Sequence, residues 1–334
     1  MMNENRPSPI TSTVDFQAEG KAHGFLKLPY SHDESAWSNI MIPITVVKNG
    51  EGPTALLTGA NHGDEYEGPV ALHRLAQELE PTHITGTVII VPAMNYPAFK
   101  AGTRTSPIDK GNMNRLFPGR PDGSVTEKIA DYFQRFLLPL ADYVVDIHAG
   151  GKTLDFVPFA AAHILRNKEQ QGRCHAAMEA FGAPYSMVLL EMDAVGMYDT
   201  AAEEMGKVFV STELGGGGSS TARSNAIAWR GVRNILVHAG ILLDEMDGHD
   251  SIRLDMPDAA CFITSESNGL FEICVDLGEA VEEGQLIARI HDAERTGTAP
   301  TEYRAKRSGI LAARHFPGQI KIGDSLAVIA EIVE

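Results

Sequence analysis

A histidine and a glutamate three residues apart are the first residues of this chain that could do chemistry. His62 and Glu65 follow the apolar run 55–58, in a turn that contains Gly59 and Gly63. The spacing is typical of metal ligands, and the two residues are predicted to lie at the carboxyl end of a strand, where open α/β sheets place ligand sites. Taken alone the pattern is weak, because a loop histidine followed by a glutamate at the positive end of a helix gives the same spacing.

A second histidine ends another apolar run. His148 follows the segment 143–147 and precedes two glycines. With His62 and Glu65 it makes a set of two histidines and one glutamate, the kind that holds a catalytic zinc ion and leaves a fourth position for water. The three cysteines show no CxxC spacing and are expected to be small buried residues in a reducing compartment, not ligands or disulfides. They are Cys174, Cys261 and Cys274.

Glu213 lies between the β-branched and aromatic run 208–212 and four glycines, 215–218. A carboxylate beside a metal site can take a proton from water and pass it to a leaving amine, which is general acid–base catalysis. The alternative is a glutamate that caps a strand end, followed by a loose surface loop. The metal-type set upstream favours the catalytic interpretation.

The segment between the first ligands and His148 contains two arginine positions of interest. Arg104 follows Asn95 by nine residues, and Asn114 precedes Arg115 in a long loop rich in proline and glycine. Long loops are uncommon unless functional. A guanidinium can bind a carboxylate through two hydrogen bonds or stabilise a developing oxyanion, although surface arginines without such a role are the ordinary case.

Taken in order, these residues resemble the catalytic pattern of the succinylglutamate desuccinylase and aspartoacylase family, which is related to the zinc carboxypeptidases. The resemblance covers most of the chain. The segments that carry a narrower resemblance, to family members that deacetylate an N-acetyl amino acid with a side-chain ammonium, are 61–69, 104–109, 117–123, 154–159 and 212–218. Within the family pattern, the resemblance implies one zinc ion per chain, held by His62, Glu65 and His148. It also implies that Glu213 activates water and that Arg104 polarises the scissile carbonyl.

Substrate recognition is predicted from the same resemblance. Asn114 and Arg115 are expected to bind the α-carboxylate of a small N-acetyl amino acid. Aspartoacylases bind the side-chain carboxylate of aspartate with an arginine ten residues before the catalytic glutamate, and the same count reaches Glu203 here. An anion in place of that cation would reverse the charge preference. The alternative for Glu203 and its neighbour is a solvated helix face. Rival acids for the same role are Glu191, Asp193 and Asp199.

Other activities remain open from the sequence. A desuccinylase or aspartoacylase would use the same metal set but needs a cationic acyl or side-chain pocket. A metallocarboxypeptidase would also share the metal set, but a β domain over the site would restrict entry to small amino acids. A non-catalytic binding protein would be expected to lack Glu213 or one of the ligands, and the chain has all of them.

The elements that must position these residues alternate between strands and helices. This alternation predicts an α/β fold, with a mostly parallel or mixed sheet covered by helices, as the resemblance to zinc carboxypeptidases implies. The predicted strands are 55–58, 87–91, 143–147, 208–212 and 234–238, and the predicted helices begin at Pro69 and span 124–137. Residues 10–50 are expected to form antiparallel strands at the sheet edge, where Pro43 is tolerated.

The pattern changes near residue 245, where helical periodicity gives way to short strands and turns. The sequence therefore predicts a catalytic α/β domain over residues 1–247 and an all-β domain over 248–334. The second domain contains a faint repeat, 269–290 against 309–329, similar to the two halves of a biotinyl or lipoyl carrier domain. The stretch between the halves lacks the lysine-bearing hairpin of such carriers, so a lid or an assembly surface is expected instead.

Composition limits the partners. The chain has 334 residues, 43% of them hydrophobic, and a net charge of −16 without clustered Lys and Arg, which argues against nucleic-acid binding. Its start is polar and no apolar run approaches the roughly 20 residues of a membrane span, so a soluble cytoplasmic protein is expected. The expected partner is a small-molecule substrate, and the sequence is also compatible with a homo-oligomer.

Overall fold

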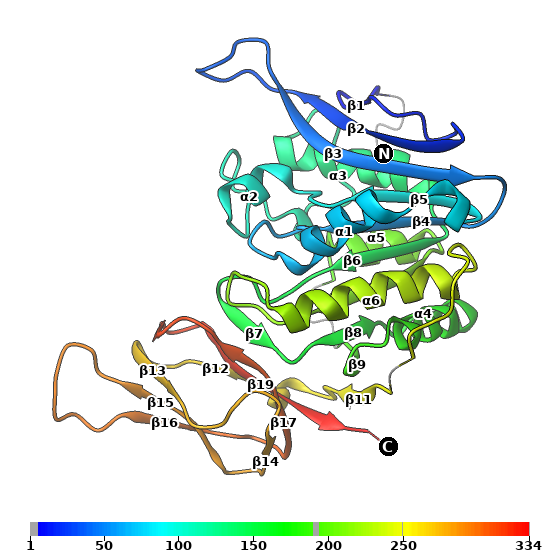
Figure 1. Cartoon of the computed structure of the whole chain (residues 1–334). Helices are drawn as coiled ribbons and strands as arrows, with labels where there is room; N and C mark the ends of the chain where they lie inside the picture. The colour runs from blue at the N-terminus through cyan, green and yellow to red at the C-terminus, as the bar shows by residue number, and fades with distance from the viewer. Residues whose placement is uncertain (1–5, 190–193, 249, 334) are drawn as a thin grey trace.

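The structure is a computed structural model that describes residues 6–189, 194–248 and 250–333. Figure 1 shows helices and strands interleaved in the first part of the chain and, after the yellow-green helix α6, strands that continue toward the C-terminus. The six α-helices of the described residues are α1 (Glu67–Glu78), α2 (Tyr96–Ala101), α3 (Val125–Tyr132), α4 (Lys168–Phe181), α5 (Tyr198–Glu204) and α6 (Ala222–His238). None of the helices in these ranges is long and apolar enough to cross a membrane.

A mixed sheet forms the centre of the first part. Its strands lie in the order β1-β2-β3-β5-β4-β6-β10-β8-β9. Their bounds are β1 (Thr11–Ser12), β2 (Gly20–Pro29), β3 (Asn39–Asn49), β4 (Thr54–Gly59), β5 (Gly86–Val91), β6 (Tyr143–Ile147), β8 (Phe159–Ala162), β9 (Tyr185–Val188) and β10 (Val208–Glu213). β5, β4, β6 and β10 are mutually parallel, so the carboxyl ends of β4, β6 and β10 lie at one edge of the sheet.

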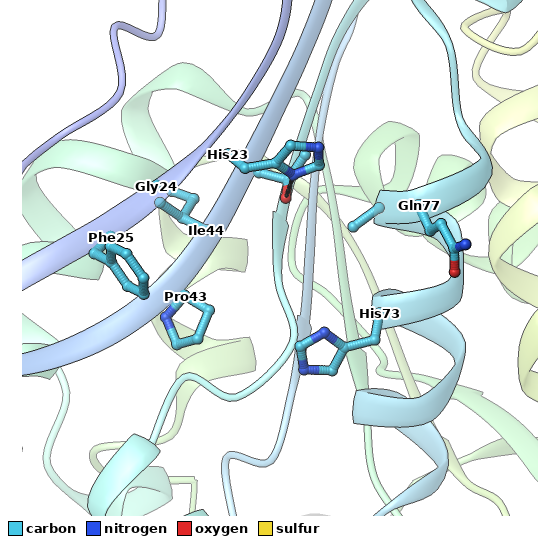
Figure 2. Close-up of a pocket in the computed structure, with 9 residues that line it drawn as sticks. His23, Gly24, Phe25, Pro43, Ile44, His73 and Gln77 are labelled. Carbon is cyan, nitrogen blue, oxygen red and sulfur yellow. Dashed lines mark hydrogen bonds between the residues drawn. The ribbon is translucent and has the colours of Figure 1, made fainter.

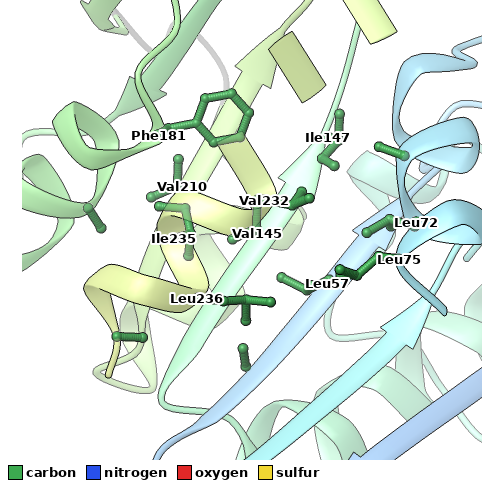
Figure 3. Packing of buried hydrophobic residues seen from close by; sticks show 14 of the residues in the cluster. Leu57, Leu72, Leu75, Val145, Ile147, Phe181, Val210, Val232, Ile235 and Leu236 are labelled. Carbon is green, nitrogen blue, oxygen red and sulfur yellow. The ribbon is translucent and has the colours of Figure 1, made fainter. Parts of the chain in front are cut away.

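Helices cover both faces of this sheet. On one face, α1, α4 and α6 pack on side chains such as Leu57, Val145 and Val210, which Figure 3 shows pointing toward the helices. On the other face, α3 and α5 pack on the alternate side chains of the same strands, including Leu56 and Phe209. Successive strand residues point to opposite faces, so strands covered on both sides read as continuous apolar runs.

The structure confirms the predicted α/β class and most of the predicted elements. One predicted strand is wrong, because residues 234–238 form the last turns of α6. The buried apolar residues of α6 recur three or four residues apart, at Ala228, Val232, Ile235 and Leu236, and this helical period outweighs the β propensity of the final residues. The helix predicted over 124–137 begins at Val125 as α3 and continues as a π-helical segment through Leu137.

The antiparallel strands expected near the N-terminus are β2 and β3, which pair along their full lengths and join the sheet through β5. β3 pairs with β5 only from Thr45 to Asn49. Pro43 therefore lies in the part of β3 that extends beyond β5, where its missing N–H removes no pairing with that strand.

The strands after α6 form a C-terminal β region, defined as β11 to β19. Their bounds are β11 (Ile252–Asp255), β12 (Phe262–Thr264), β13 (Gly269–Ile273), β14 (Ala280–Val281), β15 (Leu286–His291), β16 (Thr301–Arg304), β17 (Gly309–His315), β18 (Gln319–Ile320) and β19 (Ser325–Ile332). A small antiparallel sheet, β16-β15-β13-β18, packs there on a core of its own. The order strand, short strand, strand occurs twice, and each short strand pairs with the other unit, β14 with β17 and β18 with β13.

The two parts of the chain are joined by strand pairing. β11 pairs with β9 of the first part and with β19, so the large sheet continues into the β region. β7 (Leu154–Phe156), although it lies early in the chain, pairs with β17. The domain boundary at residue 247 stays a prediction, because strands that precede residue 247 are hydrogen-bonded to strands that follow it.

Candidate metal centre and active site

The loop after β4 carries the first two predicted ligands, and its shape depends on glycine. A side chain at Gly63 would bring a Cβ within 2.0 Å of the Ala98 backbone in α2, so only glycine allows this close approach. The Gly63 N–H donates to Thr103 O at 3.1 Å, which ties the loop to the segment that leads to Arg104. Chain folding therefore places Arg104 next to the His62 loop.

His62, Glu65 and His148 come together as a buried group. One potential ligand atom from each lies within 4.8 Å of the others. The Glu65 carboxylate lies between the two rings, with Oε1 2.7 Å from His62 Nδ1 and Oε2 2.9 Å from His148 Nδ1. The sequence prediction that these residues meet at the carboxyl ends of β4 and β6 therefore agrees with their placement.

A layer of hydrogen bonds behind His148 fixes its ring. His148 Nε2 donates to Asp146 Oδ2 at 2.7 Å. Asp146 in turn accepts from Thr58 Oγ1 at 2.7 Å and from Asn61 Nδ2 at 2.9 Å. Asp146 was not among the predicted site residues, although its position two residues before His148 in an extended segment is the spacing that puts two side chains on one face. Partners of this kind orient metal-binding histidines and raise their basicity.

The electrostatics of the group match a cation site. Burial alone would lower the pKa of His148, but the Asp146 and Glu65 carboxylates raise it well above its ordinary value. Burial would raise the pKa of Glu65, and the two histidines nevertheless hold it below its usual range. Glu65 therefore stays ionised in a buried position, where an anion is stable only with a positive partner.

The residues present fit a zinc ion. Two imidazoles and one carboxylate are the donor set of open catalytic zinc sites, and the three donors are close enough for one ion to contact all of them. His62 Nε2 is buried without a hydrogen-bond partner among the described residues, so His62 has no competing contact on that nitrogen. The group therefore offers what a metal site requires, which is converging, deprotonatable donors with a hydrogen-bonded outer layer.

Glu213 ends β10, the parallel neighbour of β6, so its backbone lies level with His148. Two hydrogen bonds link these segments. His148 N–H donates to Thr212 Oγ1 at 3.1 Å, and Leu214 N–H donates to His148 O at 3.1 Å. Burial raises the pKa of Glu213 to about 8, and the charge of Glu65 adds to the shift. Its Oε2 atom is buried and has no hydrogen-bond partner within the described part of the chain. A carboxylate with a raised pKa beside a metal-type cluster is suited to accept and return a proton.

Arg104 lies at the rim of the cluster. Its Nη1 is 3.7 Å from Glu65 Oε1, and half of its side chain is exposed. The guanidinium is thus both solvent-accessible and close to the buried metal-type group, a position from which a cation can stabilise an oxyanion.

Asn114 and Arg115 lie in a short 3-10 helix, Met113–Arg115, packed against the start of α5. Asn114 Oδ1 accepts from the Tyr198 N–H at 2.9 Å, and the Arg115 Nη1 donates to Asn114 O at 2.6 Å. Burial and the charge of Asp146 raise the pKa of Tyr198 well above its ordinary value. Its ring stacks on Phe117 and meets Phe209 of β10 edge-on, so Tyr198 ties the Asn114 loop to β10.

Glu203 is not brought to this cluster. Its Oε1 lies 3.0 Å from His163 Nδ1, and both side chains are largely buried. Glu203 is near the end of α5, where Gln170 bonds both Glu203 O and Lys207 O just before β10 begins. Since Glu213 is at the opposite end of β10, Glu203 lies at the other edge of the sheet. The ungapped count that selected it does not allow for the turn between α5 and β10.

The rival acids are distributed differently. Asp199 is buried in the first turn of α5, next to Tyr198 and so nearer to the Asn114 loop than Glu203 is. Glu191 and Asp193 lie outside the described residues. A further acid that the sequence analysis did not single out is Glu67, which accepts from Ser224 Oγ at 3.0 Å and whose pKa burial raises to about 7.

A separate cavity of about 450 Å³ lies on the outer side of β2, β3 and α1. Figure 2 shows His23, Phe25, Pro43, His73 and Gln77 around it, with His73 and Gln77 on the helix and the others on the strands. None of these residues belongs to the metal-type group. This cavity is therefore separate from the candidate active site.

Comparison with known proteins gives one consistent result. The catalytic-domain model of the succinylglutamate desuccinylase/aspartoacylase family matches residues 51–239. The N-alpha-acetyl-L-2,4-diaminobutyric acid deacetylase of Halomonas elongata is 60% identical over 99% of this chain and 97% of its own.

Solved structures agree. The product-bound structure of the ectoine utilization protein EutE from Ruegeria pomeroyi is 64% identical, with a TM-score of 0.97 over 98% of this chain and 100% of its own. A succinylglutamate desuccinylase structure from Silicibacter sp. TM1040 is 65% identical, with a TM-score of 0.96 over 98% and 100%. The matched segment contains each of the three clustered residues, as well as Arg104 and Glu213. The chain belongs to the succinylglutamate desuccinylase/aspartoacylase family.

Proposed function

We propose that this protein is a zinc-dependent amide hydrolase that removes the acetyl group from N-alpha-acetyl-L-2,4-diaminobutyrate, giving L-2,4-diaminobutyrate and acetate, in the breakdown of ectoine. The observation that carries the reaction type is the buried His62, Glu65 and His148 group with Glu213 beside it. The substrate rests on the 60% identity to the Halomonas deacetylase, which extends over 99% of the chain.

The zinc ion would be held by His62, Glu65 and His148. When bound in such a set, zinc polarises an acyl carbonyl and makes water nucleophilic near neutral pH. Glu213 takes the proton from the attacking water at a carboxylate oxygen and returns it to the departing amine nitrogen. Burial raises its pKa to about 8, which suits it to holding that proton between the two steps.

The remaining charged groups orient the substrate. Arg104 lies at the rim of the cluster and stabilises negative charge on the acyl oxygen as the carbonyl carbon becomes tetrahedral. Arg115 and Asn114, held against the start of α5, bind the α-carboxylate. These contacts fix the amide so that its carbonyl faces the metal position and its nitrogen faces Glu213.

We assign no side-chain ammonium partner to Glu203, because its carboxylate is bonded to His163 at the other edge of the sheet. Of the rival acids, Asp199 is the one within the described residues, so it is the proposed ammonium partner, buried at the start of α5 beside Tyr198. An aspartoacylase or desuccinylase would instead need a cation in that pocket, and a metallocarboxypeptidase would need a site open to peptides.

The test is release of acetate by the zinc-loaded protein from N-alpha-acetyl-L-2,4-diaminobutyrate. The N-gamma isomer, N-acetyl-L-aspartate and N-succinyl-L-glutamate serve as competing substrates. The N-alpha isomer should be preferred, and Glu213→Gln should lower kcat by roughly 10²- to 10⁴-fold with unchanged zinc content, because only proton transfer is lost. Reaction with the aspartate or glutamate conjugates alone would overturn the substrate assignment while leaving the hydrolase chemistry intact.

A matched variant distinguishes the role of Glu203 on α5 from that of Glu213 on β10. Glu203→Gln should leave the ratio of activities on the four substrates unchanged, since Glu203 is bonded to His163 and lies away from the cluster. A shift of that ratio toward anionic side chains would return Glu203 to the substrate-binding set.

A further inference from the structure

The four glycines after Glu213 are paired with β7. We call residues 214–218 the glycine loop. Phe156 N–H donates to Gly215 O at 3.1 Å, and Gly217 N–H donates to Leu154 O at 3.1 Å. A bridge between Asp155 and Gly216 lies between these bonds. One edge of β7 therefore holds the segment that directly follows the proposed general base.

The other edge of β7 belongs to the C-terminal β region. Its three residues pair antiparallel with β17, Leu154 with His315 and Phe156 with Ala313. The Arg314 Nη2 donates to Asp155 Oδ2 at 3.3 Å, and Phe316 N–H donates to Thr153 O at 2.9 Å. The β region is thus joined to the active site through one short strand.

The Phe316 side chain packs against the glycine loop. A Cβ built at Gly217 would lie 2.6 Å from the Phe316 ring, and one built at Gly216 would lie 2.0 Å from Leu154 O. The Phe316 ring also lines a cavity of about 300 Å³ with Gly215 and Glu67, behind the glycine loop. Phe316 is therefore in direct contact with the loop, while its own backbone is fixed to β7.

The loop needs such support because its backbone is intrinsically free. Gly215, Gly217 and Gly218 have φ values of +107°, +72° and +64°, and Gly216 has +158°. Glycine loses more conformational freedom on folding than any other residue, so four in succession supply no rigidity of their own. A general base must nevertheless be held within a fraction of an ångström of its productive position.

We propose that Phe316, together with the β7–β17 pairing, is a clamp by which the C-terminal β region positions the glycine loop and so Glu213. Phe316 is a positioning residue: it acts through the loop and does not touch the reacting atoms. This inference rests on the proposed function for its catalytic consequence, but the mechanical contact does not depend on which acyl amino acid is hydrolysed.

The kinetic test compares Phe316→Ala and Phe316→Leu with Ile322→Ala in the full-length, zinc-loaded protein. Ile322 is an exposed apolar residue of the same region that does not line the cavity. Phe316→Ala should lower kcat about tenfold or more at a nearly unchanged KM, because a small misplacement of a catalytic group is costly while the α-carboxylate site is on another loop. Phe316→Leu should recover most of the loss, and Ile322→Ala should match the unmodified protein.

A double-mutant cycle tests the route of the effect. Gly217→Ala introduces a methyl group against the Phe316 ring. If Phe316 acts through Gly217, the effects of Gly217→Ala and Phe316→Ala on kcat will not multiply, because the second substitution removes the clash made by the first. Fully multiplicative effects, or a kcat of Phe316→Ala equal to that of Ile322→Ala, would overturn the clamp.

A readout without substrate separates the clamp from the proposed function. The amides of Gly217 and Gly218 donate to Leu154 O and Gly151 O. Hydrogen exchange at these amides should be at least about tenfold faster in Phe316→Ala, since local opening governs exchange. Equal protection would overturn the clamp, even if acetate release occurs. Faster exchange in a protein that fails to deacetylate the proposed substrate would leave the clamp standing and remove the substrate.

Discussion

Asp146 on β6 connects polar groups of the β4 segment to one histidine of the metal-type group. It accepts hydrogen bonds from Thr58 and Asn61 on the β4 side and from Nε2 of His148, which directly follows β6. These bonds fix the ring orientation of His148, so that its Nδ1 faces Glu65. A carboxylate that hydrogen-bonds a metal-binding histidine typically raises metal affinity about 10- to 100-fold, because it orients the ring and makes it more basic.

Asp146→Asn should therefore weaken zinc binding about 10- to 100-fold without removing a ligand. The measurement is competition with a chromophoric chelator at pH 7. Asp142→Asn is the matched control, because Asp142 adjoins the other end of β6 and accepts only a backbone bond from Thr54 among the contacts described for its side chain. Equal zinc affinity in the two variants would show that Asp146 does not tune the ligand.

At the scale of elements, α4 and α6 pack closely against each other on the face of the sheet that also carries α1. Gly231 in α6 is buried, and a Cβ there would lie 2.2 Å from the ring of Phe181 at the end of α4. Phe181 is fully buried within the apolar cluster that α4 and α6 share with the sheet. Figure 3 shows Phe181 beside Val210 and α6, in the same cluster as the side chains from β4 and β6.

Gly231→Ala should destabilise the protein by roughly 1–3 kcal/mol, because overpacking outweighs the helix propensity gained by alanine. Gly172→Ala in α4 is the matched control: no atom lies within 4 Å of its added Cβ. That substitution should stabilise by about 0.5–1 kcal/mol, since the unfolded chain loses freedom without a clash. Chemical denaturation of both variants measures their free energies of unfolding. A stabilising Gly231→Ala would contradict the close packing of α6 on Phe181.

At the scale of the whole molecule, folding brings several acids into one buried region. Glu65, Glu67, Asp146 and Glu213 are gathered around two histidines, in a chain whose net charge is already −16. Burying ionised carboxylates is costly unless a positive group compensates them. A divalent cation at His62, Glu65 and His148 would supply that compensation and would link metal binding to stability.

Removal of the metal by a chelator should lower the unfolding temperature, and zinc should restore it. Binding to the folded state alone contributes about 2.7 kcal/mol at a free zinc concentration 100 times the dissociation constant. Thermal unfolding with and without chelator measures the effect. His62→Ala should show little response to either addition, whereas Glu213→Gln should respond like the unmodified protein, because Glu213 is not one of the three proposed ligands. A chelator response that persists in His62→Ala would place the metal elsewhere.

Much of the fold was predictable because it follows from local periodicity. The runs 55–58, 87–91 and 143–147 are strands in the structure, and the N-terminal antiparallel pair is present. The segment 234–238 was misassigned because a short apolar run does not distinguish a strand from the end of a buried helix. The domain boundary at 247 remains a prediction, since β11 pairs with both parts of the chain.

The sequence by itself determined which residues could form the site, because residue type and spacing select chemistry: His62, Glu65, His148 and Glu213 each follow an apolar run. Tertiary structure alone decided which of them meet. Parallel pairing of β4, β6 and β10 brings the clustered residues to one edge, whereas the reversal between α5 and β10 carries Glu203 to the other. It also decided the contacts of Asp146 with His148 and of Phe316 with the glycine loop. Such contacts depend on strand register and on packing between distant segments, and spacing along the chain does not encode either directly.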